Sequence, residues 1–146
     1  MPLTPSQASF LATHHDAAMI TTSAEGVPRV ARVAVAMVDS KLWSSGTQDR
    51  RRTQRLRRDP RCTLFVFAPQ WLWLALETTV RILDGPDAAE QSLGFFRLLQ
   101  DKPEGPLSWF GSDLEPDDFL AAMERESRLI YEFDVQRAYG INELPG

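Results

Sequence analysis

The sequence has a single cysteine, Cys62, so no disulfide can form within the chain, which suits a reducing compartment. It has no apolar run near the roughly 20 residues that a membrane span needs. Its first residues also lack the basic-then-apolar order of a secretory signal. A soluble, cytoplasmic protein without a membrane partner is therefore expected. A length of 146 residues with 43% hydrophobic content predicts one domain over residues 1–146.

Motifs of several common enzyme classes are missing as well. The chain has no G-x-S-x-G, Walker A or G-x-G-x-x-G sequence. His14 and His15 are adjacent on a predicted helix and point in different directions, so no metal site is predicted. Cys62 begins a predicted strand with no base marked nearby and is expected in the core. No residue stands out as a catalytic acid, base or nucleophile.

Lysine is scarce, because 14 of the 16 cationic residues are arginine, a side chain suited to planar, bidentate contacts with anions. Seven arginines lie between residues 50 and 61 beside one acid. This segment carries +6, whereas the whole chain carries −4 and the remainder −10. Clustered arginines repel one another unless an anion, or acids brought in by the fold, offset them. The acidic pI of about 5.2 argues against a nucleic-acid partner.

Hydrophobic periodicity and turn residues predict a helix, five strands with a small helix after the third, two helices and a last strand. Helices segregated from consecutive strands indicate an α+β fold around an antiparallel sheet, and six strands with two long members indicate a closed or half-closed barrel. The expected strands are 17–22, 28–38, 41–45, 61–68, 71–83 and 128–135, and the expected helices end near residues 14, 58, 100 and 126.

The strand expected at 28–38 has two unlike faces. Val33 and Val35 lie on a face of ordinary core residues, whereas Arg32, Ala34 and Ala36 form a narrow second face. Small side chains along a strand let a flat group approach the backbone. Packing against a bulky neighbouring strand or helix explains the alanines equally well.

The residues after the strand at 41–45 favour an anion site. Ser45 supplies a hydroxyl, and Asp49 is the expected N-cap of a helix whose first backbone N–H groups are free. Arg50 and Arg52 can approach one phosphate, with each charge-assisted bond contributing roughly 1.5–3 kcal/mol. The later arginines are expected to form a solvated helix face, namely Arg55, Arg57, Arg58 and Arg61.

A phosphate site beside an alanine-faced strand fits a ligand with a flat ring and a phosphate tail, such as a flavin-like cofactor. Trp71 and Trp73 either close over such a ring or pack in the core.

The sequence resembles the pyridoxamine 5'-phosphate oxidase-like split β-barrel family, in particular its coenzyme F420-dependent (deazaflavin) branch from actinobacteria. The resemblance rests on the segments 25–29, 50–61 and 128–140 and on the order of elements, so it covers nearly the whole chain. The family run R-x-K-x-x-N-L-R-R-D-P-R corresponds to 50–61, with Arg52 in place of the lysine and Arg55 in place of the asparagine. A strand glycine common in relatives is replaced near 77–78. These departures leave the choice of cofactor open.

The resemblance implies a six-stranded antiparallel split β-barrel with flanking helices that forms an obligate homodimer with cofactor sites at the interface. It implies that Ser45, Arg50 and Arg52 bind the phosphate and that the partner subunit contributes Trp71. The full set of expected cofactor-binding residues is Arg32, Val33, Ala34, Val35, Ser45, Gly46, Arg50, Arg52, Thr53 and Trp71.

The favoured interpretation is an oxidoreductase that transfers hydride from reduced F420 to a conjugated small molecule, which the sequence does not identify. The alternatives are an FMN-dependent oxidase or reductase of the same fold, or a non-catalytic protein that binds a flavin, a deazaflavin or heme. F420 carries an acidic tail beyond its phosphate, so the surplus of arginines favours F420 over FMN.

Overall fold

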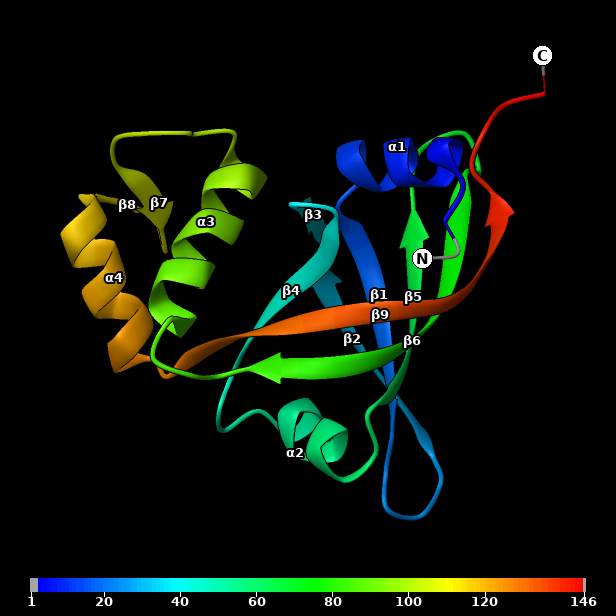
Figure 1. The fold of residues 1–146 in the computed structure, drawn as a ribbon, viewed down its shortest axis with the longest axis horizontal. Helices are drawn as coiled ribbons and strands as arrows, with labels where there is room; N and C mark the ends of the chain where they lie inside the picture. The colour runs from blue at the N-terminus through cyan, green and yellow to red at the C-terminus, as the bar shows by residue number, and fades with distance from the viewer. Residues whose placement is uncertain (1–2, 146) are drawn as a thin grey trace.

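The computed structural model describes residues 3–145 (Figure 1). The first helix starts with a capping box formed by Thr4 and Gln7. Within residues 3–145, no helix is both long and apolar enough to cross a membrane. In chain order the elements are α1 (Pro5–Thr13), β1 (Asp16–Thr22), β2 (Pro28–Ala34), β3 (Ala36–Val38), β4 (Lys41–Thr47), α2 (Arg51–Arg58), β5 (Arg61–Phe67), β6 (Trp73–Leu83), α3 (Ala88–Gln100), β7 (Leu107–Trp109), β8 (Ser112–Leu114), α4 (Pro116–Arg125) and β9 (Arg128–Ile141).

Seven strands form one antiparallel sheet in the order β2-β1-β5-β6-β9-β4-β3, and the sheet curls into a barrel (Figure 1). The predicted α+β class and antiparallel barrel are confirmed, but the predicted count of six strands is wrong. The strand expected at 28–38 is divided at Val35, because β2 pairs with β1 while β3 pairs with β4. One strand cannot keep a continuous ladder with both partners, so it breaks where it passes from one edge of the sheet to the other.

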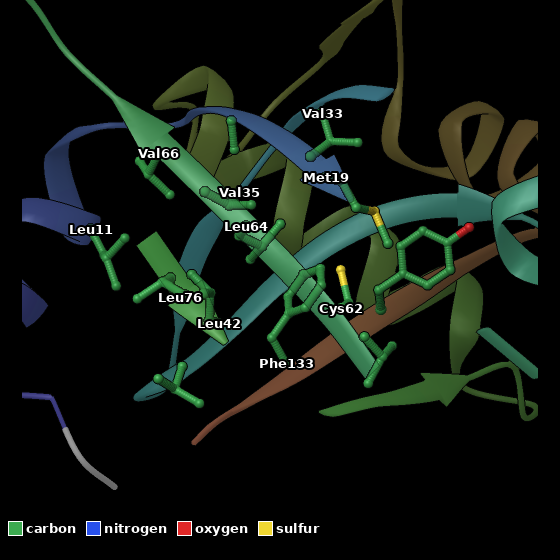
Figure 2. Close-up of a cluster of buried hydrophobic side chains, with 14 of the residues drawn as sticks. Leu11, Met19, Val33, Val35, Leu42, Cys62, Leu64, Val66, Leu76 and Phe133 are labelled. Carbon is green, nitrogen blue, oxygen red and sulfur yellow. The ribbon is translucent and has the colours of Figure 1, made fainter. Parts of the chain in front are cut away.

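Apolar side chains from the inward positions of the strands fill the barrel (Figure 2). Helices α1 and α2 lie at opposite ends of it (Figure 1). Leu11 on α1 and Leu56 on α2 each contribute to the interior cluster, and Cys62 lies in this core, as expected. Burial raises the pKa of the Cys62 thiol to about 12. The two helices therefore close the ends of the barrel with apolar side chains.

Helices α3 and α4 and the hairpin of β7 and β8 form a lobe beside the barrel (Figure 1). None of the expected strands covers this hairpin. Trp109 on β7 packs against Phe96 and Phe119. Phe95 on α3 packs against Ala36 on the outer face of the sheet, and both side chains are fully buried. At Ala36, the narrow face of the divided strand is therefore explained by a bulky helix residue.

Candidate anion and cofactor site

Helix α2 begins without a side-chain cap. Arg50 occupies the N-cap position, and its side chain makes no capping hydrogen bond within the described part of the chain. The predicted cap, Asp49, is wrong, because its carboxylate accepts a hydrogen bond from Thr47 Oγ1 at 2.5 Å. That bond is the main cause of the lowered pKa of Asp49. The first N–H groups of α2 consequently keep the partial positive charge that attracts anions to helix N-termini.

Two buried polar atoms beside this helix start have no hydrogen-bond partner among residues 3–145. They are Ser45 Oγ and Arg52 Nε. Arg52 Nη2 lies 3.5 Å from the Ser45 carbonyl oxygen, and its guanidinium lies 5.9 Å from the centre of the Tyr131 ring. A third such atom, Ser92 Oγ, lies on α3. Leaving a buried polar group unpaired costs about 1–3 kcal/mol, so the pair beside α2 is suited to a ligand that supplies acceptors.

The interior contacts below α2 fix where the helix starts. Thr53 Oγ1 donates to the Thr47 carbonyl oxygen at 2.7 Å and also forms a hydrogen bond with the Tyr131 hydroxyl. A Cβ at Gly46 would lie 2.3 Å from that hydroxyl oxygen. Gly46 and Thr53 thus face the interior and have only backbone groups to offer a ligand. Tyr131 was missed as a site residue, although it lies in the closing segment that carries the family resemblance.

The arginine run divides according to its acidic partners. Arg57 pairs with Asp84 at 2.9 Å and Arg61 with Asp59 at 2.8 Å, so these two arginines are neutralised locally. Among residues 3–145, no acid forms an ion pair with any of the others in the run or with one arginine from β2, namely Arg50, Arg51, Arg52, Arg55, Arg58 and Arg29. These six arginines, called the cationic cluster below, extend from the start of α2 to its last turn and onto β2.

Arg55 lies at the centre of that cluster. Its pKa is lowered, first by burial and then by the charges of Arg29, Arg51, Arg52 and Arg58. Its Nε donates to Thr21 Oγ1 on β1 at 2.7 Å. The prediction that Arg55 belongs to a solvated face is therefore wrong, whereas Arg57, Arg58 and Arg61 are exposed as expected.

The residues expected to line the ligand ring, 32–35, lie on β2 and at its break with β3, and their side chains point in two directions. Val33 and Val35 point into the core (Figure 2), so only their backbone groups can reach a ligand outside the barrel. Arg32 is exposed, 3.5 Å from Asp16, and Ala34 is half-buried. Because Ala36 is covered by α3, Ala34 is the small outward residue that remains accessible.

Trp71 occupies the tip of the β5–β6 hairpin and is 93% exposed. Its φ is 63° and that of Gln70 is 66°, so two consecutive non-glycine residues adopt the left-handed conformation. Next to the hairpin, Trp73 is half-buried, 5.6 Å from Phe65 and 6.2 Å from Tyr139 between ring centres. With Phe67 and Ile141, these residues form an apolar outer face of the barrel, called the aromatic face below.

Two cavities lie near these elements. One of about 680 Å³ is lined by residues 47–50 and 125–127, and so adjoins the start of α2. The other, of about 490 Å³, lies over β4, β6 and β9. There, Lys41 is already 3.8 Å from the carboxylate of Glu132. The first cavity shares Arg50 with the cationic cluster, and the carboxylates of Asp49 and Glu126 also line it.

Comparison with known proteins places this geometry in a family. Residues 3–139 match the family profile described as pyridoxamine 5'-phosphate oxidase. A conserved hypothetical protein from Mycobacterium tuberculosis is 15% identical with a TM-score of 0.72, over 99% of this chain and 90% of that one. An F420 reductase is 21% identical with a TM-score of 0.64, over 90% of this chain and 94% of that one.

A heme-binding protein from Mycobacterium smegmatis is 13% identical with a TM-score of 0.63, over 97% of this chain and 55% of that one. At these identities the structural likeness shows a common fold. No curated protein sequence matches the chain. Because the family profile spans nearly the whole sequence and the curled antiparallel sheet agrees with it, this chain belongs to the pyridoxamine 5'-phosphate oxidase family.

Proposed function

We propose that this protein binds coenzyme F420 and uses it, as an oxidoreductase, to reduce a conjugated small molecule. The observation that carries the proposal is the pair of buried, unpartnered atoms, Ser45 Oγ and Arg52 Nε, beside the uncapped start of α2. A phosphate offers acceptor oxygens to the hydroxyl, to the guanidinium and to free helix N–H groups simultaneously. These residues therefore fit the phosphate of a flavin-like or deazaflavin cofactor.

The chain's own residues orient the ligand and supply its electrostatic environment. Arg50 and Arg52 hold the phosphate, and the backbone of the divided strand at Ala34 offers a narrow surface to a flat ring. When bound, the reduced deazaflavin supplies the hydride. Trp71 limits the access of water to the ring from the partner subunit of a dimer.

The cationic cluster favours F420 over FMN. FMN ends at its phosphate, which carries about two negative charges. The six arginines of the cationic cluster exceed that charge. Arg55 and Arg58 lie after the first turn of α2, and Arg29 lies on β2, where its charge acts on Arg55. An acidic tail continuing from the phosphate accounts for them. An FMN-dependent oxidase or reductase remains the second candidate, because the phosphate contacts would suit either cofactor and the family match favours a flavin.

The aromatic face supports a homodimer. Phe65, Phe67, Tyr139 and Ile141 are all exposed and lie on adjacent strands, an arrangement that marks an interaction surface. We propose a second copy of this chain as the occupant, with each Trp71 placed over the partner's ring site. The strained, exposed conformation of Trp71 supports this role, because strain persists where function requires it.

The cofactor experiment is an anaerobic titration of the purified protein with F420 and with FMN, read by fluorescence. Arg52→Ala and Ser45→Ala are expected to weaken F420 binding by tenfold or more, because each removes a bond to the phosphate of roughly 1.5–3 kcal/mol. The matched control is Arg57→Ala on the same helix, whose charge is already paired. Equal losses in all three variants reduce the site to a diffuse charge patch, and a wild type that binds neither cofactor at micromolar concentration overturns the proposal.

Two further comparisons separate the alternatives. Arg29→Ala and Arg58→Ala are expected to weaken F420 binding several-fold more than FMN binding, because only F420 has a tail for them to contact. Equal effects on the two cofactors favour the FMN-dependent enzyme. Saturable binding without turnover of any substrate in a panel of conjugated carbonyl and heterocyclic compounds favours a binding protein.

The dimer is tested by light scattering during size-exclusion chromatography. Phe67→Glu on the aromatic face is expected to convert a dimer into a monomer and to weaken F420 binding with it. Phe110→Glu is the control, because this residue is 83% exposed but lies on the turn between β7 and β8. A monomeric wild type, or a Phe67→Glu variant that remains dimeric, rules out this interface.

A further inference from the structure

At the break between β2 and β3, the backbone of Val35 is hydrogen-bonded to His15, which lies between α1 and β1. His15 Nδ1 lies 2.8 Å from the Val35 carbonyl oxygen, and the Val35 N–H donates to the His15 carbonyl oxygen at 2.8 Å. Beside them, Ser44 Oγ donates to the Ala34 carbonyl oxygen at 2.6 Å. These contacts satisfy backbone groups that lose their sheet partners where the strand changes edges.

The contact fixes the tautomer of His15. A carbonyl oxygen only accepts, so Nδ1 carries the proton and Nε2 is the nitrogen without one in the neutral ring. His14 differs, although it is adjacent and equally half-buried. Its Nδ1 lies 3.0 Å from the Phe10 carbonyl oxygen within the same helix end, and its ring stacks on Phe10. Only His15 therefore connects to the divided strand.

We propose that His15 is a positioning residue for the flat ring of the ligand. It holds the Val35 peptide, and with it the accessible Ala34, in the one arrangement that presents this backbone outside the barrel. Because the Val33 and Val35 side chains point inward, a ring on this strand meets peptide groups, and their orientation decides the fit (Figure 2). The inference rests on the proposed function in taking that ligand to be F420.

The test compares His15→Leu, His15→Asn and the matched control His14→Leu. In His15→Asn the side-chain amide supplies an N–H near the position of Nδ1 and is expected to restore wild-type behaviour. Without any ligand, His15→Leu is expected to accelerate hydrogen exchange of the Val35 amide at least tenfold, while His14→Leu leaves it unchanged. The 15N shifts of the wild-type imidazole report the tautomer independently.

Binding is then measured with two probes, F420 and inorganic phosphate, the latter by thermal protection. His15→Leu is expected to weaken F420 binding about tenfold and to shift the absorption band of the bound ring, while phosphate protection stays at the wild-type level. Arg52→Ala is expected to reduce both. This difference separates a disturbed ring contact from a disturbed phosphate contact.

Each alternative result has a distinct meaning. Unchanged F420 affinity and spectrum in His15→Leu overturn the inference, as do an Nε2–H tautomer in the wild type or a His15→Asn variant as weak as His15→Leu. If His15→Leu does not fold, F420 binding that is weaker in His15→Asn than in the wild type still overturns the inference. A wild type that binds neither probe overturns the proposed function, and the inference with it, before any variant is compared.

Discussion

Replacing Gly46 by alanine tests the packing below the anion site most sharply. The new Cβ would lie 2.3, 2.4 and 2.7 Å from Oη, Cζ and Cε2 of Tyr131. Tyr131 is fully buried and its hydroxyl is bonded to Thr53, so the ring has no open space to enter. Overpacking of a core costs about 1–3 kcal/mol, and displacing the Tyr131–Thr53 hydrogen bond adds about 1 kcal/mol. We expect a loss of about 3 kcal/mol in the free energy of unfolding, or a Tm roughly 10 °C lower.

Gly94→Ala is the matched control because it makes the same chemical change with the opposite expected sign. Gly94 lies inside α3, and a Cβ there meets no described atom within 4 Å. Alanine in a helix interior is about 0.5–1 kcal/mol more favourable than glycine. Urea unfolding followed by tryptophan fluorescence measures both variants. A loss below about 1 kcal/mol for Gly46→Ala at an unchanged m-value, or an equal loss for Gly94→Ala, refutes the argument.

Three other predictions concern the hairpin, the thiol and the acid range. Trp71→Gly is expected to leave the free energy of unfolding unchanged or to raise it by up to about 1 kcal/mol, because glycine adopts a left-handed φ without strain. The same change is expected to weaken F420 binding. A clear loss of stability in urea contradicts this prediction. Cys62 is expected to resist thiol reagents at about pH 8 until urea unfolds the chain, because its buried thiol has a pKa of about 12; rapid labelling of the native protein contradicts this. The pKa of Asp59 is lowered to about 2, chiefly by the Arg61 hydrogen bond, so its stabilising contribution is present above the unfolded pKa of 3.8 and disappears as the pH falls through 2. The urea midpoints of the wild type and Asp59→Asn should therefore converge as the pH approaches 2. A difference that stays constant down to pH 2 argues against a stabilising Asp59–Arg61 pair.

Local sequence signals predicted most elements because each depends on neighbouring residues. The Thr4 capping box and the alternation of β1 are visible within a few positions. The end of β9 was placed at Val135, six residues too early, because a bulge opposite Glu77 and Thr78 leaves Gln136 unpaired and breaks the alternation. The break at Val35 was also invisible, since it depends on which two strands become the edges of the sheet.

The site was predictable in its charge but not in its partners. The sequence indicates the arginine surplus near Ser45 and Arg52, and the structure brings these two residues together. The sequence does not reveal which arginines are neutralised by acids. Asp59 pairs with Arg61, whereas Asp84 pairs with Arg57 from a distant segment of the chain. Tyr131 and His15 act through contacts 78 and 20 residues away in the chain, so no local pattern marks them.

The position of β9 has a consequence for synthesis of the chain. This last strand lies between β6 and β4 in the sheet, although it follows β6 by 44 residues. Until it leaves the ribosome, the strands of this sheet can pair only as β2-β1-β5-β6 and, separately, as β4-β3. The edge of β6 that pairs with β9 therefore stays unpaired while α3, β7, β8 and α4 are synthesised. The barrel is therefore completed only after β9 has been translated. Until then, the unpaired edge of β6 is a site at which the nascent protein can aggregate.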